Sequence, residues 1–101
     1  MKHSRTKATD IPKYVRIEVG IRDNGNCIIC GQVGIPNAHF IPRSQGGLGI
    51  KENIVTLCFK CHHEFDNGSH RIDYEKIIEK YLKSKYEAWD KNKLIYNKWM
   101  H

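Results

Sequence analysis

The chain has 101 residues, of which 17 are Lys or Arg and 11 are Asp or Glu, so its net charge at neutral pH is +6. This length suits one small domain with a modest core, and the positive charge favours a polyanionic partner such as nucleic acid. No stretch approaches the ~18 consecutive apolar residues that cross a bilayer, which excludes a membrane-spanning protein.

Residues 1–9 are polar and basic and show no hydrophobic periodicity, which predicts a flexible N-terminal arm. Residues 1–22 carry six basic side chains against Asp10 and Glu18, so four of the six net positive charges lie there. Such an arm suits contact with DNA phosphates, and the residues expected to make it are Lys2, Arg5 and Lys7.

A helix is predicted to follow this arm. Asp10 suits the N-cap position and Pro12 the first turn. The apolar residues from position 15 to 21 alternate as in a strand, yet Ile11, Val15 and Val19 also fit one helical face. The capping signal favours the helix.

Four cysteines form two C-x-x-C pairs with 27 residues between them: Cys27, Cys30, Cys58 and Cys61. This spacing is typical of a zinc site built from two knuckles. Two disulfides are the alternative, but these are typical of exported proteins, and the N-terminus has no apolar export segment. The sequence therefore favours zinc and a cytoplasmic location. Four thiolates fill the coordination shell, so this ion is expected to stabilise the fold without taking part in catalysis.

A β-hairpin and a short helix are predicted around the second cysteine pair. Residues 38–42 and 53–57 read as strands, and the glycine-rich residues 44–49 as a flexible turn between them. A helix over residues 58–66 is expected to end at Gly68, in the left-handed conformation that follows many helices.

The clearest helical pattern follows Asp73, which is expected to cap it. Its apolar residues match one helical face at every position: Tyr74, Ile77, Ile78, Tyr81 and Leu82. The remaining residues, to position 99, have less regular spacing and suggest a further helix that packs on the core. Residues 73–99 are therefore expected to form C-terminal helices.

Two sequence motifs stand inside this framework. An H-x-x-P-R-S-x-G-G run begins at His39, and an N-x-x-x-L-C-x-x-C-H run begins at Asn53 and ends at His62. Together with the first cysteine pair they closely resemble the HNH endonuclease superfamily over about residues 27–66. The resemblance implies an α+β fold: a small ββα-metal (His-Me finger) core with a four-cysteine structural zinc, flanked by N-terminal and C-terminal helices, in one domain over residues 10–101.

The resemblance also implies roles for individual residues. His39 would be the general base that deprotonates water, and Asn53 would fix the loop and orient the imidazole. His62 would bind a catalytic cation, Mg²⁺, Mn²⁺, Ni²⁺ or Zn²⁺. Asp66 lies four residues after His62, on the same helical face, and is a candidate second ligand. Arg43 is expected to bind a phosphate oxygen.

Each of these residues has an ordinary structural alternative. His39 and Asn53 suit a strand histidine and a turn asparagine, and His62 is a further candidate ligand for the structural zinc. Asp66 suits a helix-end acid, and Arg43 a solvated surface charge. One position departs from the family pattern, because many members place Asp or His immediately before the base, where this chain has Ala38. An alanine cannot bind a metal, which puts the ligand set of the catalytic cation in doubt.

The function expected from the resemblance is a divalent-metal-dependent DNA endonuclease or nickase. Small phage and prophage HNH proteins have a similar length and basic character, which suggests a bacterial or phage-infected cell and a phage packaging partner. One active site cuts one strand at a time, so double-strand cleavage would need a homodimer or two successive nicks. The alternative is a non-catalytic zinc-ribbon module that binds nucleic acid or protein.

Overall fold

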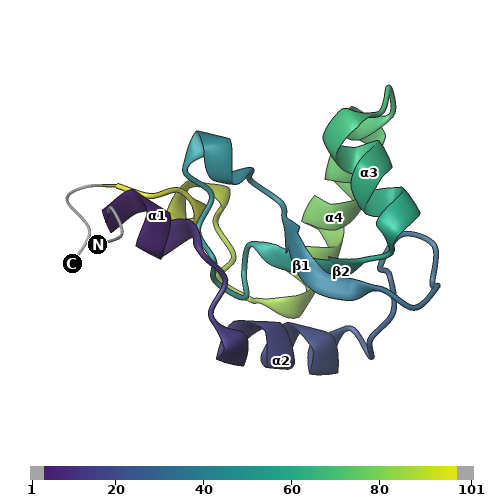
Figure 1. Ribbon diagram of the computed structural model, residues 1–101, viewed down its shortest axis with the longest axis horizontal. Helices are drawn as coiled ribbons and strands as arrows, with labels where there is room; N and C mark the ends of the chain where they lie inside the picture. The colour runs from purple at the N-terminus through teal and green to yellow at the C-terminus, as the bar shows by residue number, and fades with distance from the viewer. Residues whose placement is uncertain (1–3, 98–101) are drawn as a thin grey trace.

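The computed structural model describes residues 4–97 and has an α+β fold, as the sequence predicts (Figure 1). A two-stranded antiparallel sheet lies at its centre, with helix α2 on one side and helices α3 and α4 on the other. The elements in chain order are α1 (Ser4–Thr9), α2 (Lys13–Arg22), β1 (Ile35–His39), a 3₁₀ turn (Arg43–Gln45), β2 (Ile54–Leu57), α3 (Phe59–Asn67), α4 (Arg71–Lys85) and a second 3₁₀ turn (Lys91–Leu94).

The hairpin holds its two strands in a register that places Ala38 opposite Val55 and His39 opposite Ile54. Strand β1 starts and ends earlier than residues 38–42, so the predicted bounds of this strand were wrong. The pairing stops beyond Phe40 because the Ile41 amide bonds the side chain of Asn53 and Pro42 has no amide hydrogen. His39 thus stands at the last position of β1, where the chain leaves the sheet.

Each face of the hairpin is covered by helix. Val15 and Val19 of α2 are buried with Ile54, which confirms the predicted helix and its apolar face. On the opposite face Phe65 of α3 and Ile78 of α4 are fully buried. Burial of such side chains stabilises the fold by about 1.5–3 kcal/mol each, so helices on both faces fix the short hairpin.

The N-terminal residues are more ordered than predicted. Residues 4–9 form helix α1 rather than a flexible arm, and Thr9 at its end is buried. The arm is held because the amide of Gly49 donates to the Ala8 carbonyl and Arg5 donates to the backbone carbonyls of Arg43 and Ser44. Lys2, the other predicted phosphate contact of this arm, lies outside the described residues.

Asp10 does not cap α2, which corrects the sequence prediction. The helix begins at Lys13, Pro12 occupies the N-cap position, and no side chain caps the helix there. The Asp10 carboxylate instead accepts a hydrogen bond from the guanidinium of Arg43, a residue distant in sequence. The Asp10 carboxylate therefore forms a tertiary ion pair instead of the local capping bond that the sequence predicted.

The glycine-rich turn is closely packed, and the prediction that it would be flexible was wrong. Residues 46–49 are all buried. A Cβ on Gly47 would overlap the Ile41 carbonyl, and one on Gly49 would overlap the Asp10 carbonyl. The second 3₁₀ turn and the residues after it also hold the glycine-rich turn, because the Leu48 amide donates to the Leu94 carbonyl and the Gly46 carbonyl accepts from the Tyr96 amide. The glycines here permit close backbone approach rather than motion.

The C-terminal part contains the predicted helix with a different start. Helix α4 begins at Arg71, so Asp73 lies in its first turn and is not its cap. Gly68 ends α3 with φ −84° and ψ 169°, which is extended and not left-handed. The predicted further helix is absent from residues 86–97, which hold only the second 3₁₀ turn, and residues 98 and 99 lie outside the described part. Within residues 4–97 no helix is long and apolar enough to span a membrane.

A buried ion pair joins α2 to α4. Arg22 Nε donates to Asp23 Oδ1 at 2.7 Å, Tyr81 donates to the same carboxylate, and Arg22 Nη1 lies 2.9 Å from the Tyr86 hydroxyl. Asp23 Oδ2 also accepts from the Thr56 amide of β2 at 2.9 Å. Burial alone would raise the pKa of Asp23, but the bonds from Arg22 and Tyr81 hold it below its ordinary value. The pair satisfies its charges and fixes three elements together.

Candidate active site and metal centre

The four cysteines meet at one point between the chain before β1 and the start of α3. Their sulfur atoms all lie within 4.8 Å of one another, and Cys30 Sγ is 3.5 Å from Cys58 Sγ. None of them forms a disulfide. A tetrahedral zinc with bonds of ~2.3 Å sets its sulfur ligands roughly 3.8 Å apart, so the cluster fits this ion.

Local structure prepares these sulfurs for a cation. Cys58 is the N-cap of α3, and its sulfur accepts a hydrogen bond from the Cys61 amide. That bond lowers the pKa of Cys58 to about 7, whereas burial raises the pKa of Cys61. Metal binding requires thiolates, and a bound cation would favour the charged form at the buried position too. Four thiolate ligands would leave a bound zinc with no open position, which is typical of structural zinc sites.

His39 is the half-buried last residue of β1. Its Nε2 atom lies 2.8 Å from the carbonyl oxygen of Thr9. A carbonyl only accepts, so Nε2 carries the hydrogen and Nδ1 keeps a free lone pair. Burial lowers the pKa of His39 below its ordinary value, and the nearby positive charge of Arg43 adds to the shift. The ring is therefore neutral at pH 7 and able to accept a proton at Nδ1.

Asn53 is fully buried and bonds the loop that follows His39. Its Oδ1 accepts from the Ile41 amide at 2.8 Å, and its Nδ2 donates to the carbonyls of Leu48 at 2.8 Å and Ile41 at 3.2 Å. Among the described residues its amide bonds no atom of the imidazole. The backbone carbonyl of Asn53 accepts from the amide of Phe40, so Asn53 contacts the residue that follows His39 rather than His39 itself.

His62 and Asp66 lie on one face of α3, with His62 Nε2 3.3 Å from Asp66 Oδ2. They line a hollow of about 520 Å³ together with His39 and Arg43. Four residues singled out from the sequence thus meet in one place. Within residues 4–97 the four cysteines are the one cluster of three or more His, Cys, Asp or Glu side chains that could bind a metal. His62 and Asp66 therefore offer two ligands for a second cation. Ala38 is fully buried and adds none.

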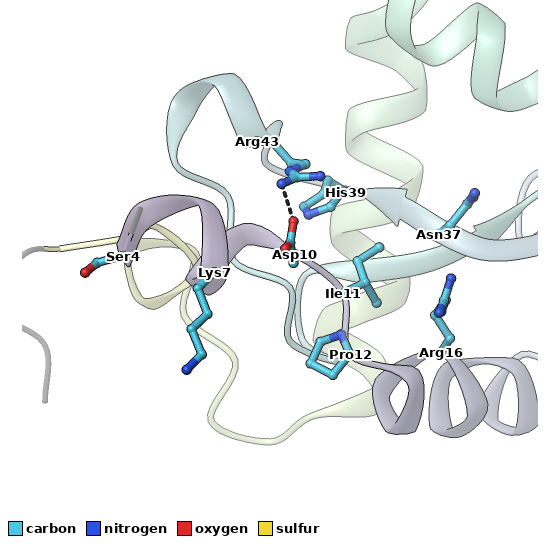
Figure 2. Close-up of a pocket in the computed structure, with 9 residues that line it drawn as sticks. All are labelled: Ser4, Lys7, Asp10, Ile11, Pro12, Arg16, Asn37, His39 and Arg43. Atoms are coloured by element: carbon cyan, nitrogen blue, oxygen red, sulfur yellow. Dashed lines mark hydrogen bonds and ion pairs between the residues drawn. The ribbon is translucent and has the colours of Figure 1, made fainter. Parts of the chain in front are cut away.

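Arg43 lies at the edge of this hollow, in the 3₁₀ turn, with its side chain half exposed. Figure 2 shows its guanidinium beside His39 and joined to Asp10. Arg5 donates to backbone carbonyls of the same turn, while the Lys7 side chain on α1 points away from His39 (Figure 2). Of the described basic residues expected at phosphates, Arg43 therefore lies beside the candidate base, and both Arg43 and Arg5 already have partners.

Sequence reasoning missed two contributors to this site, the Thr9 carbonyl and the Asp10 carboxylate. Both come from the N-terminal segment, roughly 30 residues before the groups they contact. A backbone carbonyl leaves no trace in a sequence pattern. Asp10 does leave a signal in the sequence, because it is the one acidic residue among the first 17 residues, which are otherwise rich in basic side chains.

Comparison with known proteins agrees with this geometry. A family model described as HNH endonuclease matches residues 27–68. A protein named anaredoxin from Nostoc sp. (strain PCC 7120 / SAG 25.82 / UTEX 2576) is 35% identical over 53 residues, which cover 50% of this chain and 70% of that protein. No solved structure matches the chain. The order of the motifs, the hairpin followed by α3, the clustered cysteines and these matches together show that the chain belongs to the HNH endonuclease family.

Proposed function

We propose that this protein is a divalent-metal-dependent DNA endonuclease or nickase with His39 as its general base. The observation that carries the proposal is the hydrogen bond from His39 Nε2 to the Thr9 carbonyl, which leaves Nδ1 as the proton acceptor of a residue that lines the hollow. Family membership supports nuclease chemistry on DNA. The lowered pKa of His39 supports it further, since the neutral ring is present at physiological pH.

Phosphodiester hydrolysis would use the residues of the hollow as follows. His39 Nδ1 accepts a proton from the attacking water, while the Thr9 carbonyl holds the imidazole in one orientation. Arg43 donates to a phosphate oxygen. His62 and Asp66 would hold the catalytic cation, which supplies charge stabilisation to the phosphate and the leaving oxygen. Substrate oxygens and water would complete its shell because Ala38 offers no ligand.

The test is cleavage of supercoiled plasmid in Mg²⁺, Mn²⁺, Ni²⁺ or Zn²⁺, with nicked, linear and closed forms resolved. His39→Ala should lower the cleavage rate by a factor of about 10²–10⁴ while zinc content and DNA affinity stay near wild type. His62→Ala should be partly rescued by more divalent cation, whereas His39→Ala should not. His63→Ala is the matched control, because His63 is exposed and lines neither hollow beside His39.

A non-catalytic zinc-binding module is the second candidate, and one observation favours it. The position before His39 is a fully buried alanine, and the cluster of described cation ligands beside the base has only two members. Such a module would bind DNA through its basic surface and leave plasmid intact in every cation. Equal nicking by wild type and His39→Ala would also reject the general base proposed above.

A further inference from the structure

A second hollow lies on the other side of His39, between α1, the start of α2 and β1. Its volume is about 1100 Å³, above the roughly 1,000 Å³ upper end of small-molecule pockets. His39 and Arg43 line both hollows, so the second one is continuous with the candidate active site. Figure 2 shows Lys7 of α1, Arg16 of α2 and Asn37 of β1 around it.

The charges of this hollow fit a polyanion. Among the described lining residues, the basic side chains of Lys7, Arg16 and Arg43 stand against one carboxylate, that of Asp10. Lys7 and Arg16 are exposed, and neither has an ion-pair partner within residues 4–97. No Phe, Tyr or Trp side chain is among the described residues of the lining. The surface therefore suits backbone phosphates rather than stacked bases, which is how proteins hold duplex DNA without reading its sequence.

Asp10 adds an observation of its own. Its carboxylate pairs with Arg43, whose guanidinium lines both hollows. A guanidinium binds carboxylate and phosphate through the same parallel N–H donors. The side chains of the pair are 49% and 29% exposed, and solvent-exposed ion pairs are weak, so a phosphate can replace the carboxylate.

We propose that this hollow, formed by the N-terminal helices and β1, binds the backbone of duplex DNA beside the scissile phosphate. In the free protein the Asp10 carboxylate occupies the place on Arg43 that a DNA phosphate takes when DNA binds. The inference rests on the proposed function for the place of cleavage, but Lys7, Asp10 and Arg16 lie outside the family match over residues 27–68. They would fix where the strand runs, while the chemistry stays with His39 and α3.

Binding is measured by fluorescence anisotropy of a labelled DNA duplex, with the full-length zinc-loaded protein, no added catalytic cation, and several salt concentrations. Lys7→Ala and Arg16→Ala should each weaken binding and reduce the slope of log affinity against log salt by about 0.9, the value of one phosphate contact. Asp10→Asn should act in the opposite direction, with tighter binding and a steeper slope, because Arg43 loses its internal partner. Lys80→Ala, an exposed lysine on α4, is the matched control and should leave the slope unchanged.

The tighter binding of Asp10→Asn cannot come from misfolding, so it keeps the test decisive if the other variants lose stability. Wild-type slopes for Lys7→Ala and Arg16→Ala, or weaker binding by Asp10→Asn, would overturn the inference. Tighter binding of an RNA duplex of the same sequence would overturn the assignment to DNA. The plasmid assay separates this inference from the proposed function. Cleavage that needs His39 but is unchanged in Lys7→Ala and Arg16→Ala would reject only the DNA-binding role of the hollow. Binding that depends on the hollow, without any cleavage, would reject only the endonuclease activity.

Discussion

Asn53→Ala should destabilise the protein by removing the hydrogen bonds of one buried side chain. Asn53 accepts from the Ile41 amide and donates to the carbonyls of Ile41 and Leu48. Three bonds at about 0.5–1.5 kcal/mol each give a loss of roughly 3 kcal/mol, before any further cost of the unpaired Ile41 amide. In a domain of about 100 residues, 1 kcal/mol shifts Tm by about 4–8 °C, so Tm should fall by roughly 12–24 °C.

Thermal and urea unfolding of the zinc-loaded protein measure this change. Asn67→Ala is the matched control, because Asn67 is exposed and makes one weak bond of 3.4 Å to the His63 carbonyl. Its Tm should stay within a few degrees of wild type. The rate of plasmid cleavage by Asn53→Ala should also fall, even at temperatures well below its melting range, since the loop that carries Arg43 would lose its support. A Tm equal to that of Asn67→Ala would refute the assignment of Asn53 as the residue that holds this loop.

Two other predictions concern the metal centre and the base. Cys58→Ala should leave the chain unfolded at 25 °C, because a structural zinc contributes on the order of 10 kcal/mol against a total stability of about 5–15 kcal/mol. Circular dichroism measures the loss of folded structure, and elemental analysis measures the loss of zinc. A folded, zinc-free variant would disprove the structural role. Cleavage should be flat above about pH 6.5 and fall at more acid pH, because burial holds the pKa of His39 below that value and only the neutral ring accepts a proton. A rate that still climbs through pH 8 would assign the base to another group.

The features that the sequence predicted well are those encoded by short spacings. Two C-x-x-C pairs, an apolar helical face with period 3.6 and the run of β-branched residues before Cys58 each specify a local structure. The cysteine cluster, the apolar face of α2, the hairpin, α3 and α4 follow from them. His39, His62 and Asp66 came together because the same motif fixes the strand end and the helix that carry them.

The features that the sequence did not predict depend on contacts between distant residues. Arg22 contacts Tyr86, which lies 64 positions later, and Asp23 contacts Tyr81, which lies 58 positions later. No local pattern distinguishes such residues from solvated charges and ordinary aromatics. The same holds for Asp10, whose local signal for a helix cap was outweighed by the guanidinium of Arg43. The C-terminal residues gave no helix because they pair with the glycine-rich turn instead, as in the bridge between Gly47 and Ile95.

The packed glycine-rich turn bears on how far the HNH motif can be moved between proteins. Three backbone bonds hold it from outside residues 27–68: Gly49 to Ala8, Leu48 to Leu94, and Tyr96 to Gly46. A graft of residues 27–68 into another scaffold would carry the four cysteines, His39, Asn53 and His62. It would leave two turn amides and one carbonyl without partners, and the Nε2 hydrogen of His39 without its acceptor. Any host for this motif must therefore supply three acceptors and one donor at the same places.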